Sequence, residues 1–356
     1  MDKSIKFKTK ELQEVLNLLF LGTDTTALSS EKAKCFLFKT IDSQVYCLAS
    51  SQNISLSYNF GEIGDLNVCL DAKKLKHLVD KTKKEEIEFF KKDEDTWSIK
   101  GAGNYKLQNF IFDFADTFHT DALEEKIFSS LSADLSKAME RSIFFVNDER
   151  QDPHLRNFYF DGNMVATDKK SIQVVTTTIK SENKKLLIPQ IFYDVCKKLD
   201  TTINFYEKDS YYVITSGNYR VRLNKILGIE KFPEYSSFLE SCESFENTLH
   251  FSRIDFLECI ERATVFTDKN MYYGLTLKIT PEKLSILVDE ADKIEEEISC
   301  EATVACDITL NSQYVKEMAS IFADETIEMK FNSSTEVVLF KDSFSKLILV
   351  PVVLNK

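Results

Sequence analysis

Apolar residues recur at helical spacing in three places along the chain, each time just after a short alternating segment. The first alternating segment covers residues 5–7, and the apolar positions that follow it are spaced i, i+3, i+4 and i+7. This spacing predicts an amphipathic helix with one buried face, preceded by a strand. The apolar positions of the three copies are Leu12, Val15, Leu16 and Leu19; Leu135, Ala138 and Met139; and Phe256, Cys259, Ile260 and Ala263.

A second helix is predicted later in each copy. Asp71 and Asn311 suit the residue that caps a helix, and Pro189 suits a first helical turn. Alternating segments such as residues 211–215 and 335–339 predict strands between and after the helices. The six predicted helices cover residues 9–21, 71–84, 132–146, 189–199, 252–266 and 311–323.

A tight turn between two predicted strands marks the end of each copy. Residues 103–107 read Gly-Asn-Tyr-Lys-Leu and residues 217–221 read Gly-Asn-Tyr-Arg-Val, which is typical of a hairpin turn. The third copy, at residues 341–346, has lost the glycine. Three kinds of marker share one period of about 120 residues, and this indicates an internal repeat.

The repeat predicts an α+β fold of three like domains, each with two helices packed on antiparallel sheet. The length of 356 residues fits two or three domains. Because polar segments separate the copies, we place the domains at residues 1–125, 126–246 and 247–356. No Gly/Ser-rich linker separates them, so we expect the domains to pack rigidly.

The composition narrows the class of protein. No run approaches the roughly 20 apolar residues of a membrane span, and the first residues lack the apolar core of a signal peptide. We therefore expect a cytoplasmic protein. The eight cysteines form no Cys-x-x-Cys pair, which favours buried, reduced thiols over disulfides or a metal site.

No catalytic pattern is evident in the sequence. The four histidines are scattered without the spacing of metal ligands, and there is neither a P-loop nor a Gly-x-Gly-x-x-Gly motif. The carboxylates are abundant but unpatterned. We therefore expect a binding protein that is not an enzyme and that needs neither cofactor nor metal.

Three motifs, in order, give the sequence a family resemblance. Residues 165–172, Val-Ala-Thr-Asp-Lys-Lys-Ser-Ile, resemble the Val-Ala-Thr-Asp-Gly-His-Arg-Leu motif of the β subunit of bacterial DNA polymerase III, the DNA sliding clamp. Residues 231–235, Lys-Phe-Pro-Glu-Tyr, are similar to its Arg-Phe-Pro-Asp-Tyr, and residues 347–354 resemble its apolar ending. The first copy is a poorer match, since residues 49–53 lack the usual Thr-Asp pair.

The resemblance implies a ring. In this family two chains pair head to tail as a homodimer, six domains encircle duplex DNA without reading its sequence, and the helices line the hole. The partners implied are double-stranded DNA, the catalytic subunit of DNA polymerase III and the clamp loader. The net charge of −12 fits such a ring only if cations gather on one surface, and lysines and arginines do outnumber carboxylates within the six predicted helices.

The resemblance and the helix charge together indicate three sets of site residues. The expected DNA-facing residues are Lys73, Lys74, Arg141, Arg150, Gln151, Lys197 and Lys198. The expected cleft for partner peptides comprises Phe160, Thr167, Lys170, Ile172, Pro233, Tyr235, Phe238, Ile348, Val350 and Pro351. The expected dimer interface joins Tyr105 and Leu107 of one chain to Val265 and Phe266 of the other.

Other interpretations stay open at this point. Each lysine could be an ordinary solvated charge, and the interface and cleft residues could be internal core. The weak first copy allows a divergent clamp paralogue that binds polymerase peptides without encircling DNA. Lys169 and Lys170, which replace Gly and His of the family motif, allow an enzyme that uses the cleft beside them. Retention on circular but not on linear DNA would separate these alternatives.

Overall fold

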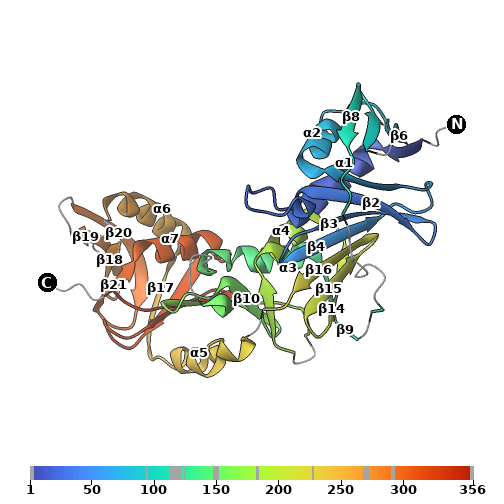
Figure 1. Cartoon of the computed structure of the whole chain (residues 1–356). Helices are drawn as coiled ribbons and strands as arrows, with labels where there is room; N and C mark the ends of the chain where they lie inside the picture. The colour runs from blue at the N-terminus through green and yellow to red at the C-terminus, as the bar shows by residue number, and fades with distance from the viewer. Residues whose placement is uncertain are drawn as a thin grey trace. The chain divides into compact units, whose positions relative to one another are not determined.

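The fold is taken from a computed structural model of the chain. It describes residues 4–93, 95–112, 122–123, 125–146, 152–181, 184–226, 228–267, 273–289 and 293–352. The chain forms two compact units (Figure 1). Unit 1 comprises Met1–Ser136 and Ile191–Lys225, and unit 2 comprises Lys137–Gln190 and Ile226–Lys356.

The first copy of the repeat lies in unit 1. Its β1 and α1 are the strand and helix predicted at the start of the chain. Its elements are β1 (Ile5–Lys8), α1 (Thr9–Leu19), η1 (Phe20–Gly22), η2 (Lys32–Lys34), β2 (Cys35–Ile41), β3 (Gln44–Ser50), β4 (Ile54–Asn59), β5 (Asn67–Asp71), α2 (Ala72–Asp80), β6 (Glu86–Lys91), β7 (Thr96–Lys100) and β8 (Asn104–Gln108).

The second copy is shared between the two units. Its elements are β9 (Lys126–Leu131), α3 (Ser132–Glu140), η3 (Ile143–Phe145), η4 (Pro153–Arg156), β10 (Asn157–Phe160), β11 (Asn163–Thr167), β12 (Ser171–Thr176), β13 (Leu186–Pro189), α4 (Ile191–Lys198), β14 (Thr202–Glu207), β15 (Tyr211–Ser216) and β16 (Tyr219–Asn224). Two further helices, η5 (Ile229–Lys231) and α5 (Tyr235–Glu243), follow β16.

The third copy lies in unit 2. Its elements are β17 (Asn247–Ser252), α6 (Arg253–Ala263), η6 (Thr264–Phe266), β18 (Gly274–Ile279), β19 (Lys283–Asp289), β20 (Lys293–Ala302), β21 (Cys306–Asn311), α7 (Ser312–Ile321), β22 (Thr326–Phe331), β23 (Val338–Lys341) and β24 (Ser345–Leu349). The predicted domain boundaries fall directly before β9 and β17, and they stay a prediction.

Strand pairing confirms the threefold repeat. Within the residues that the structure describes, each copy has eight strands, and in each copy the first, sixth, seventh and eighth strands pair in that order, as in β1-β6-β7-β8. The fifth, second, third and fourth strands also pair in that order, as in β5-β2-β3-β4. Because the same order recurs as β9-β14-β15-β16 and β13-β10-β11-β12, and again in the third copy, the three copies share one topology.

Neighbouring copies are joined through one rule of pairing. The fourth strand of the first copy, β4, pairs antiparallel with the eighth strand of the second, β16. The fourth strand of the second copy, β12, pairs antiparallel with the eighth strand of the third, β24. These two junctions build the eight-stranded sheet of unit 1 and the twelve-stranded sheet of unit 2.

Buried aromatic rings hold the sheets and helices of unit 1 together. Phe7 of β1 lies 5.7 Å from Phe38 of β2 and 4.9 Å from Phe89 of β6, measured between ring centroids. Phe205 of β14 lies 4.9 Å from Phe128 of β9 and 5.7 Å from Phe192 of α4. Burial of such rings is the main stabilising contribution to this packing.

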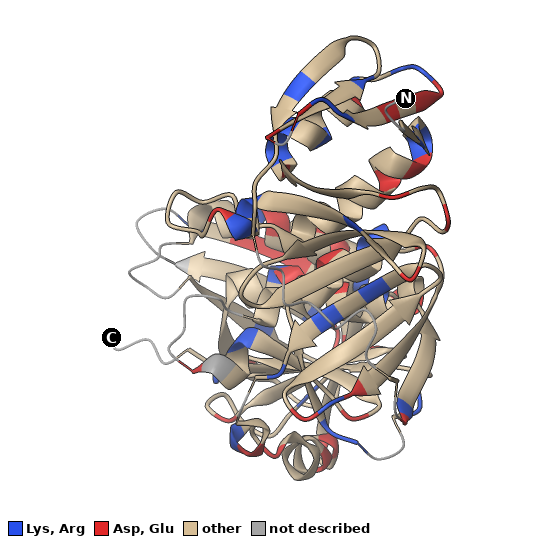
Figure 2. Ribbon diagram, turned by 45° about the vertical axis from the view of Figure 1, so that its right-hand side comes forward, with Lys and Arg blue, Asp and Glu red and all other residues tan. Residues whose placement is uncertain are grey.

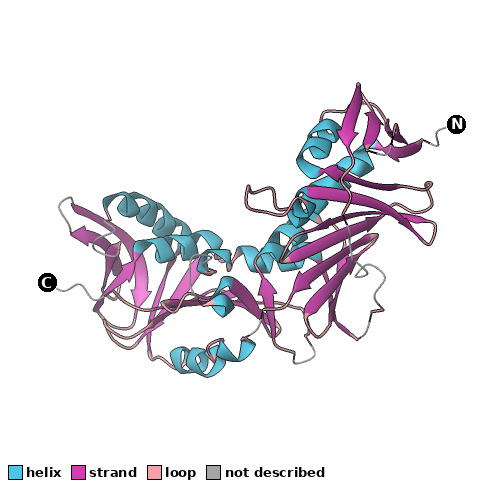
Figure 3. Cartoon of the chain, viewed as in Figure 1, coloured by secondary structure: helices cyan, strands magenta, loops and turns pink. Residues whose placement is uncertain are grey.

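The helices of unit 2 cover both faces of its sheet. Helices α6 and α7 lie side by side on one face, and α5 lies on the other (Figures 1 and 3). Tyr235, Leu239 and Cys242 direct α5 onto the sheet, where they join clusters with Ile172 and Ile348. Helix α5 was not among the predicted helices, so the second copy carries one helix more than we expected.

The structure shortens several predicted helices. Helix α2 ends at Asp80, so Lys81, Lys83 and Lys84 lie in the loop beyond it. Arg141 likewise lies just past the end of α3. Within their observed bounds the six repeat helices carry as many carboxylates as lysines and arginines, so the predicted excess of positive charge on them is wrong.

All eight cysteines are free thiols. Within the ranges that the structure describes, none of the helices has the length and apolar character needed to cross a membrane.

Candidate functional site

Two predicted DNA-facing lysines lie on the exposed side of α2. Lys73 and Lys74 are exposed, whereas Leu75 and Val79 are fully buried on the opposite side of the helix. The carboxylate of Asp71 accepts a hydrogen bond of 2.8 Å from the backbone N–H of Lys74 and so caps the helix. Several basic positions are visible on α2 and on the neighbouring four-stranded sheet (Figure 2).

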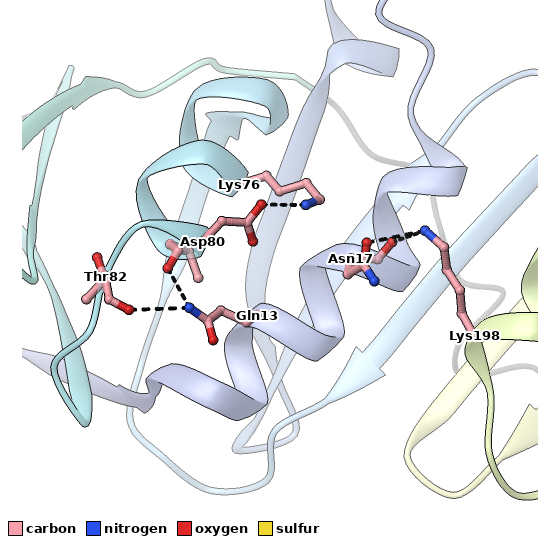
Figure 4. Close-up of polar contacts among 7 residues, drawn as sticks. Gln13, Asn17, Lys76, Asp80, Thr82 and Lys198 are labelled. Atoms are coloured by element: carbon pink, nitrogen blue, oxygen red, sulfur yellow. Dashed lines mark hydrogen bonds and ion pairs between the residues drawn. The ribbon is translucent and has the colours of Figure 1, made fainter.

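Lys197 and Lys198 end helix α4. The Nζ atom of Lys198 donates to Asn17 of α1, at 2.8 Å to the backbone oxygen and 3.3 Å to the side-chain Oδ1 (Figure 4). Partial burial, followed by the charge of Lys76, lowers the pKa of Lys198. The ammonium of Lys197 lies 5.0 Å from the ring centroid of Tyr193. Lys198 therefore links two copies of the repeat as well as adding charge.

The remaining predicted DNA-facing residues are not brought to this lysine group by the described contacts. Arg141 belongs to unit 2, where its guanidinium lies 5.2 Å from the ring centroid of Phe344. Hydrogen bonds from Ser343 are the largest cause of the lowered pKa of Asp324, and the charge of Arg141 adds to it. Arg150 and Gln151 lie outside the described residues.

Several residues of the predicted peptide cleft lie on the face of the unit 2 sheet that α5 covers. Ile172 of β12 is directly opposite Ile348 of β24, and the backbone N–H of Val350 donates to the backbone oxygen of Lys170 at 3.1 Å. Val350 and Phe238 are exposed by 50% and 40% of their surface. Lys170 and Pro233 are exposed as well, and Ile172 is half-buried. These exposed residues form the surface that a peptide could reach without rearrangement.

The other predicted cleft residues support that surface from within. Phe160, Thr167, Tyr235, Ile348 and Pro351 are buried. Tyr235 donates to the carboxylate of Asp161 at 2.9 Å, and burial is the main cause that raises its pKa to about 12. Tyr235 and Ile348 belong to the clusters that pack α5 on the sheet, whereas Phe160 follows Tyr159 of that cluster and faces the other side of the sheet.

The turn between β11 and β12 is fixed by Asp168. Its carboxylate accepts hydrogen bonds from the backbone of Lys170 at 2.9 Å and of Ser171 at 2.8 Å, and from the hydroxyl of Tyr314 in α7. The turn places Lys169 at a left-handed φ of 71° and pairs its amine with Asp152. A lysine engaged in an ion pair on an exposed turn gives no support to a catalytic role.

The predicted interface strand β8 is the end strand of its sheet. Tyr105 is half-buried and Leu107 is buried, and both lie on the same face of the strand. Lys106 points to the other face and lies beside Lys92; this contact is the largest cause of the lowered pKa of Lys92. Two amines held close together attract an acidic partner.

At the other end of the repeat, β20 offers a complementary edge. Its residues 293–299 pair with β19 on one side only, and its last residues pair with β17. Ile294 and Ile298 alternate along it with the exposed Glu295 and Glu297. Nearby η6 leaves Val265 exposed by 80% and Phe266 by 38%. Sequence reasoning identified the η6 residues but missed the acidic edge, although its run of glutamates was visible.

Among the residues that the structure describes, no group of His, Cys, Asp and Glu could hold a metal ion.

The sequence matches no protein-family model and no curated protein. Solved structures, in contrast, match over nearly the whole chain. A putative DNA polymerase III β subunit from Eubacterium rectale has a TM-score of 0.88 at 15% identity, covering 98% of both chains. The β subunit from Thermotoga maritima has a TM-score of 0.86 at 16% identity, covering 99% of this chain and 100% of its own. The DNA polymerase sliding clamp from Bacillus subtilis has a TM-score of 0.86 at 15% identity, covering 100% of both. The chain therefore has the three-domain fold of DNA polymerase III β subunits, as the resemblance predicted.

Proposed function

We propose that this chain is a DNA sliding clamp, in which two copies close head to tail around duplex DNA and tether the replicative polymerase. The observation that carries the proposal is a pair of strand edges in the described residues: β8 ends the sheet of the first copy, and residues 293–299 of β20 in the third copy pair with β19 on one side only. At the two internal junctions the fourth strand of one copy pairs with the eighth strand of the next copy. Within one chain, β20 has no following copy to pair with and β8 has no preceding one.

The closing contact follows from the two internal junctions. Both join the fourth strand of one copy to the eighth strand of the next. An equivalent backbone hydrogen bond is present at both junctions. The N–H of Asn59 donates to the backbone oxygen of Asn218 at the first, and the N–H of Thr176 donates to the backbone oxygen of Phe344 at the second. The same rule applied to the ends pairs β20 of one chain with β8 of another. A repeated head-to-tail contact closes a ring when its rotation allows, and the fold resemblance implies two chains.

The two edges complement each other chemically. On the helix-facing side, Ile294 and Ile298 would meet Tyr105 and Leu107. On the outer side, Glu295 and Glu297 would meet Lys106 and its neighbour Lys92. Apolar residues thus face apolar residues, with Glu296 between the two isoleucines bound by Arg262 of α6, and the two amines face carboxylates.

The exposed residues of η6 fit the same rule. At the first junction η1, which follows the first helix of its copy, contacts α4, the second helix of the next copy. At the second junction Phe144 and Phe145 of η3 lie 5.7 Å and 6.0 Å from Tyr314 of α7, between ring centroids. Val265 and Phe266 of η6 would accordingly contact α2 of the second chain, and this contact would cover them.

DNA would be held weakly through phosphates. The exposed lysines of α2 and α4, Lys73, Lys74, Lys197 and Lys198, are the main candidates in unit 1, and Arg141 is the candidate in unit 2. Arg150 and Gln151 stay predictions. Sequence-independent contacts of this kind permit sliding, because no base-specific bond holds the ring in place.

The double variant Lys73→Glu, Lys74→Glu tests the DNA-facing surface. It should weaken binding to a linear duplex and reduce the slope of log affinity against log salt by about 0.9 for each phosphate that the variant no longer neutralises. Fluorescence anisotropy over a salt series measures both. Lys39→Glu, which changes an exposed lysine on β2, is the matched control and should leave the slope unchanged. If the unmodified protein, the double variant and Lys39→Glu all gave the same salt slope, α2 would not contact DNA.

The exposed surface beside α5 would take short peptides of the DNA polymerase III catalytic subunit and of the clamp loader. An apolar surface with a few polar groups suits peptide side-chain anchors. The proposed role is that of a scaffold without catalysis, cofactor or metal.

One observation favours a second candidate function. Within their observed bounds the six repeat helices carry balanced charge, so they attract DNA less strongly than the predicted helix bounds implied. A divergent clamp paralogue that binds polymerase peptides without encircling DNA would need no such attraction. Retention on circular DNA separates the two candidates.

A further inference from the structure

The two internal junctions of the repeat share a backbone pattern but differ in the side chains beneath it. Each junction aligns five pairs of residues, β4 with β16 at the first and β12 with β24 at the second. All four strands have a neighbour on both sides. The equivalent backbone hydrogen bonds described above align the two junctions with each other. By this alignment Gln173 of β12 takes the place of Leu56 in β4, and Ser345 of β24 takes the place of Tyr219 in β16.

Apolar side chains fill the helix-facing side of the first junction. Leu56 is fully buried against η1, where a Cβ atom added at Gly22 would lie 2.6 Å from its Cδ1 atom. The rings of Tyr58 and Tyr219 lie 4.6 Å apart, between centroids, and the hydroxyl of Tyr58 donates to Glu11 at 2.9 Å. Separation of β4 from β16 would expose these apolar groups to water, which is unfavourable.

Polar side chains occupy the same side of the second junction. Gln173 alternates with Ile172 and Val174, which pack toward α5, so its own side chain faces the helices on the other side of the sheet. It is fully buried, and neither its amide nitrogen nor its amide oxygen has a hydrogen-bond partner among the described residues. The hydroxyl of Ser345 is buried as well and lacks a partner in the same part of the chain.

These two unsatisfied side chains are neighbours. Gln173 is directly opposite Leu347, and Ser345 lies two positions before Leu347 on the same side of β24. Ser171, the third polar residue on this side, donates from its hydroxyl to Asp168 at 2.7 Å and is satisfied. The unsatisfied groups therefore gather at the end of the junction that lies away from the Asp168 turn.

The free energy lost by burying these groups is recovered when the strands separate. A buried amide without a partner has given up its hydrogen bonds to water, and opening restores them. Because the two junctions align the same number of residue pairs, the second should open more readily than the first. Local openings of this kind need less free energy than unfolding of the whole protein.

The outer side of the second junction belongs to the proposed peptide surface. Ile172 of β12 is half-buried, and Val350, which follows β24, is exposed. The N–H of Val350 donates to the backbone oxygen of Lys170, just before β12, so these positions span the two strands. An apolar anchor can contact both Ile172 and Val350 only while the strands are paired. A ligand that binds one of two states shifts the population toward that state.

We propose that the second junction opens locally in the native protein because Gln173 and Ser345 are buried without partners, and that an apolar peptide anchor on its outer side holds it closed. The first part concerns the fold alone. The second part rests on the proposed peptide-binding function. Occupancy of the peptide surface thereby stabilises the contact between the second and third copies of the repeat.

Amide hydrogen exchange of the full-length protein tests the first part. Exchange is followed by peptide mass spectrometry over residues 171–176 and 345–349, and is compared with residues 54–59 and 219–224 after correction for intrinsic rates. The second junction should exchange roughly tenfold faster, which is the order expected for a buried polar group left without a partner. Equal protection at the two junctions would overturn the proposal.

Two variants connect that difference to the side chains. Gln173→Leu supplies the residue that the first junction has at this position, and it should slow exchange at the second junction roughly tenfold without changing the first. Ser345→Ala removes only a hydroxyl and should slow exchange there by a smaller factor. Ser334→Ala, at an exposed serine of the third copy, is the control and should change neither junction. Exchange at the second junction that neither Gln173→Leu nor Ser345→Ala slows would contradict the proposal.

A synthetic peptide of the DNA polymerase III catalytic subunit tests the second part. At saturation it should slow exchange at the second junction and leave the first unchanged. A bound peptide without this effect would overturn the closing role. A peptide that calorimetry shows not to bind would overturn the proposed peptide surface and the closing role together, whereas the difference between the two junctions would stand.

Discussion

Reversing the charges of Lys106 on β8 and of Lys92 beside it, with Lys92→Glu and Lys106→Glu, is expected to convert the proposed dimer into monomers at micromolar concentration. The new carboxylates would face Glu295 and Glu297 of the second chain, and like charges brought together across an interface cost several kcal/mol. The dissociation constant should rise by roughly 100-fold or more. Reversing the charge of β20 instead, with Glu295→Lys and Glu297→Lys, should have the same effect on the dissociation constant. Sedimentation equilibrium measures both.

An equimolar mixture of the two variants makes this prediction specific to head-to-tail pairing. In a mixed ring, one contact pairs a reversed β8 with a reversed β20, and the other pairs two unchanged edges. Both contacts are complementary, so the mixture should form dimers. Lys39→Glu, which lies on β2 and on neither edge strand, should remain a dimer throughout. Variants that stay dimeric on their own, or that stay monomeric when mixed, would contradict the β8–β20 contact.

The second large effect is expected at the peptide surface. Val350→Asp should weaken binding of a DNA polymerase III catalytic-subunit peptide by roughly 100-fold, because an unpaired carboxylate would be buried under the peptide's apolar anchors. Val350 is exposed by 50%, so the protein itself should fold and dimerise as before. Isothermal titration calorimetry measures the affinity.

Val304→Asp is the matched control for that variant. Val304 is also an exposed valine of unit 2, at 38%, and it lies outside the predicted cleft. It should bind the peptide with unchanged affinity. Similar affinities for the Val350 variant and the unmodified protein would show that the peptide binds elsewhere.

The parts of the fold that repeat were the parts that sequence could predict. Leu12, Val15, Leu16 and Leu19 place one buried face on α1, and two equivalent patterns recur, so the repeat and its helices were visible without contacts. Helix ends were less visible. The lysines after Asp80 continue no apolar face, and only the observed end of α2 shows that they belong to a loop.

Helix α5 was missed although its signal was present. Tyr235, Phe238, Leu239 and Cys242 have the helical spacing i, i+3, i+4 and i+7, but the segment lies between two copies where we expected a boundary. The sequence also did not show which of the predicted cleft residues are buried and which are exposed. A motif match marks positions in a chain and says nothing of depth, so Phe160 and Val350 came from the same resemblance while one is buried and the other exposed.

Long-range pairing was beyond the sequence. Lys92 and Lys106 are fourteen positions apart in the chain, and only the pairing of β6, β7 and β8 brings their amines together. The one-sided pairing of residues 293–299 in β20 likewise follows from the registers with β17 and β19 and not from its own residues. Alternation predicts strands, but it does not say which strand lacks a neighbour.

Retention on DNA tests the central claim most directly. The protein is combined with the clamp loader proposed for it and a nicked circular plasmid, separated from free protein by gel filtration in high salt, and followed before and after the plasmid is cut once. A closed ring that slides should stay with the circle and leave after linearisation. Loss from both forms alike, or equal retention on both, would contradict a clamp that encircles DNA.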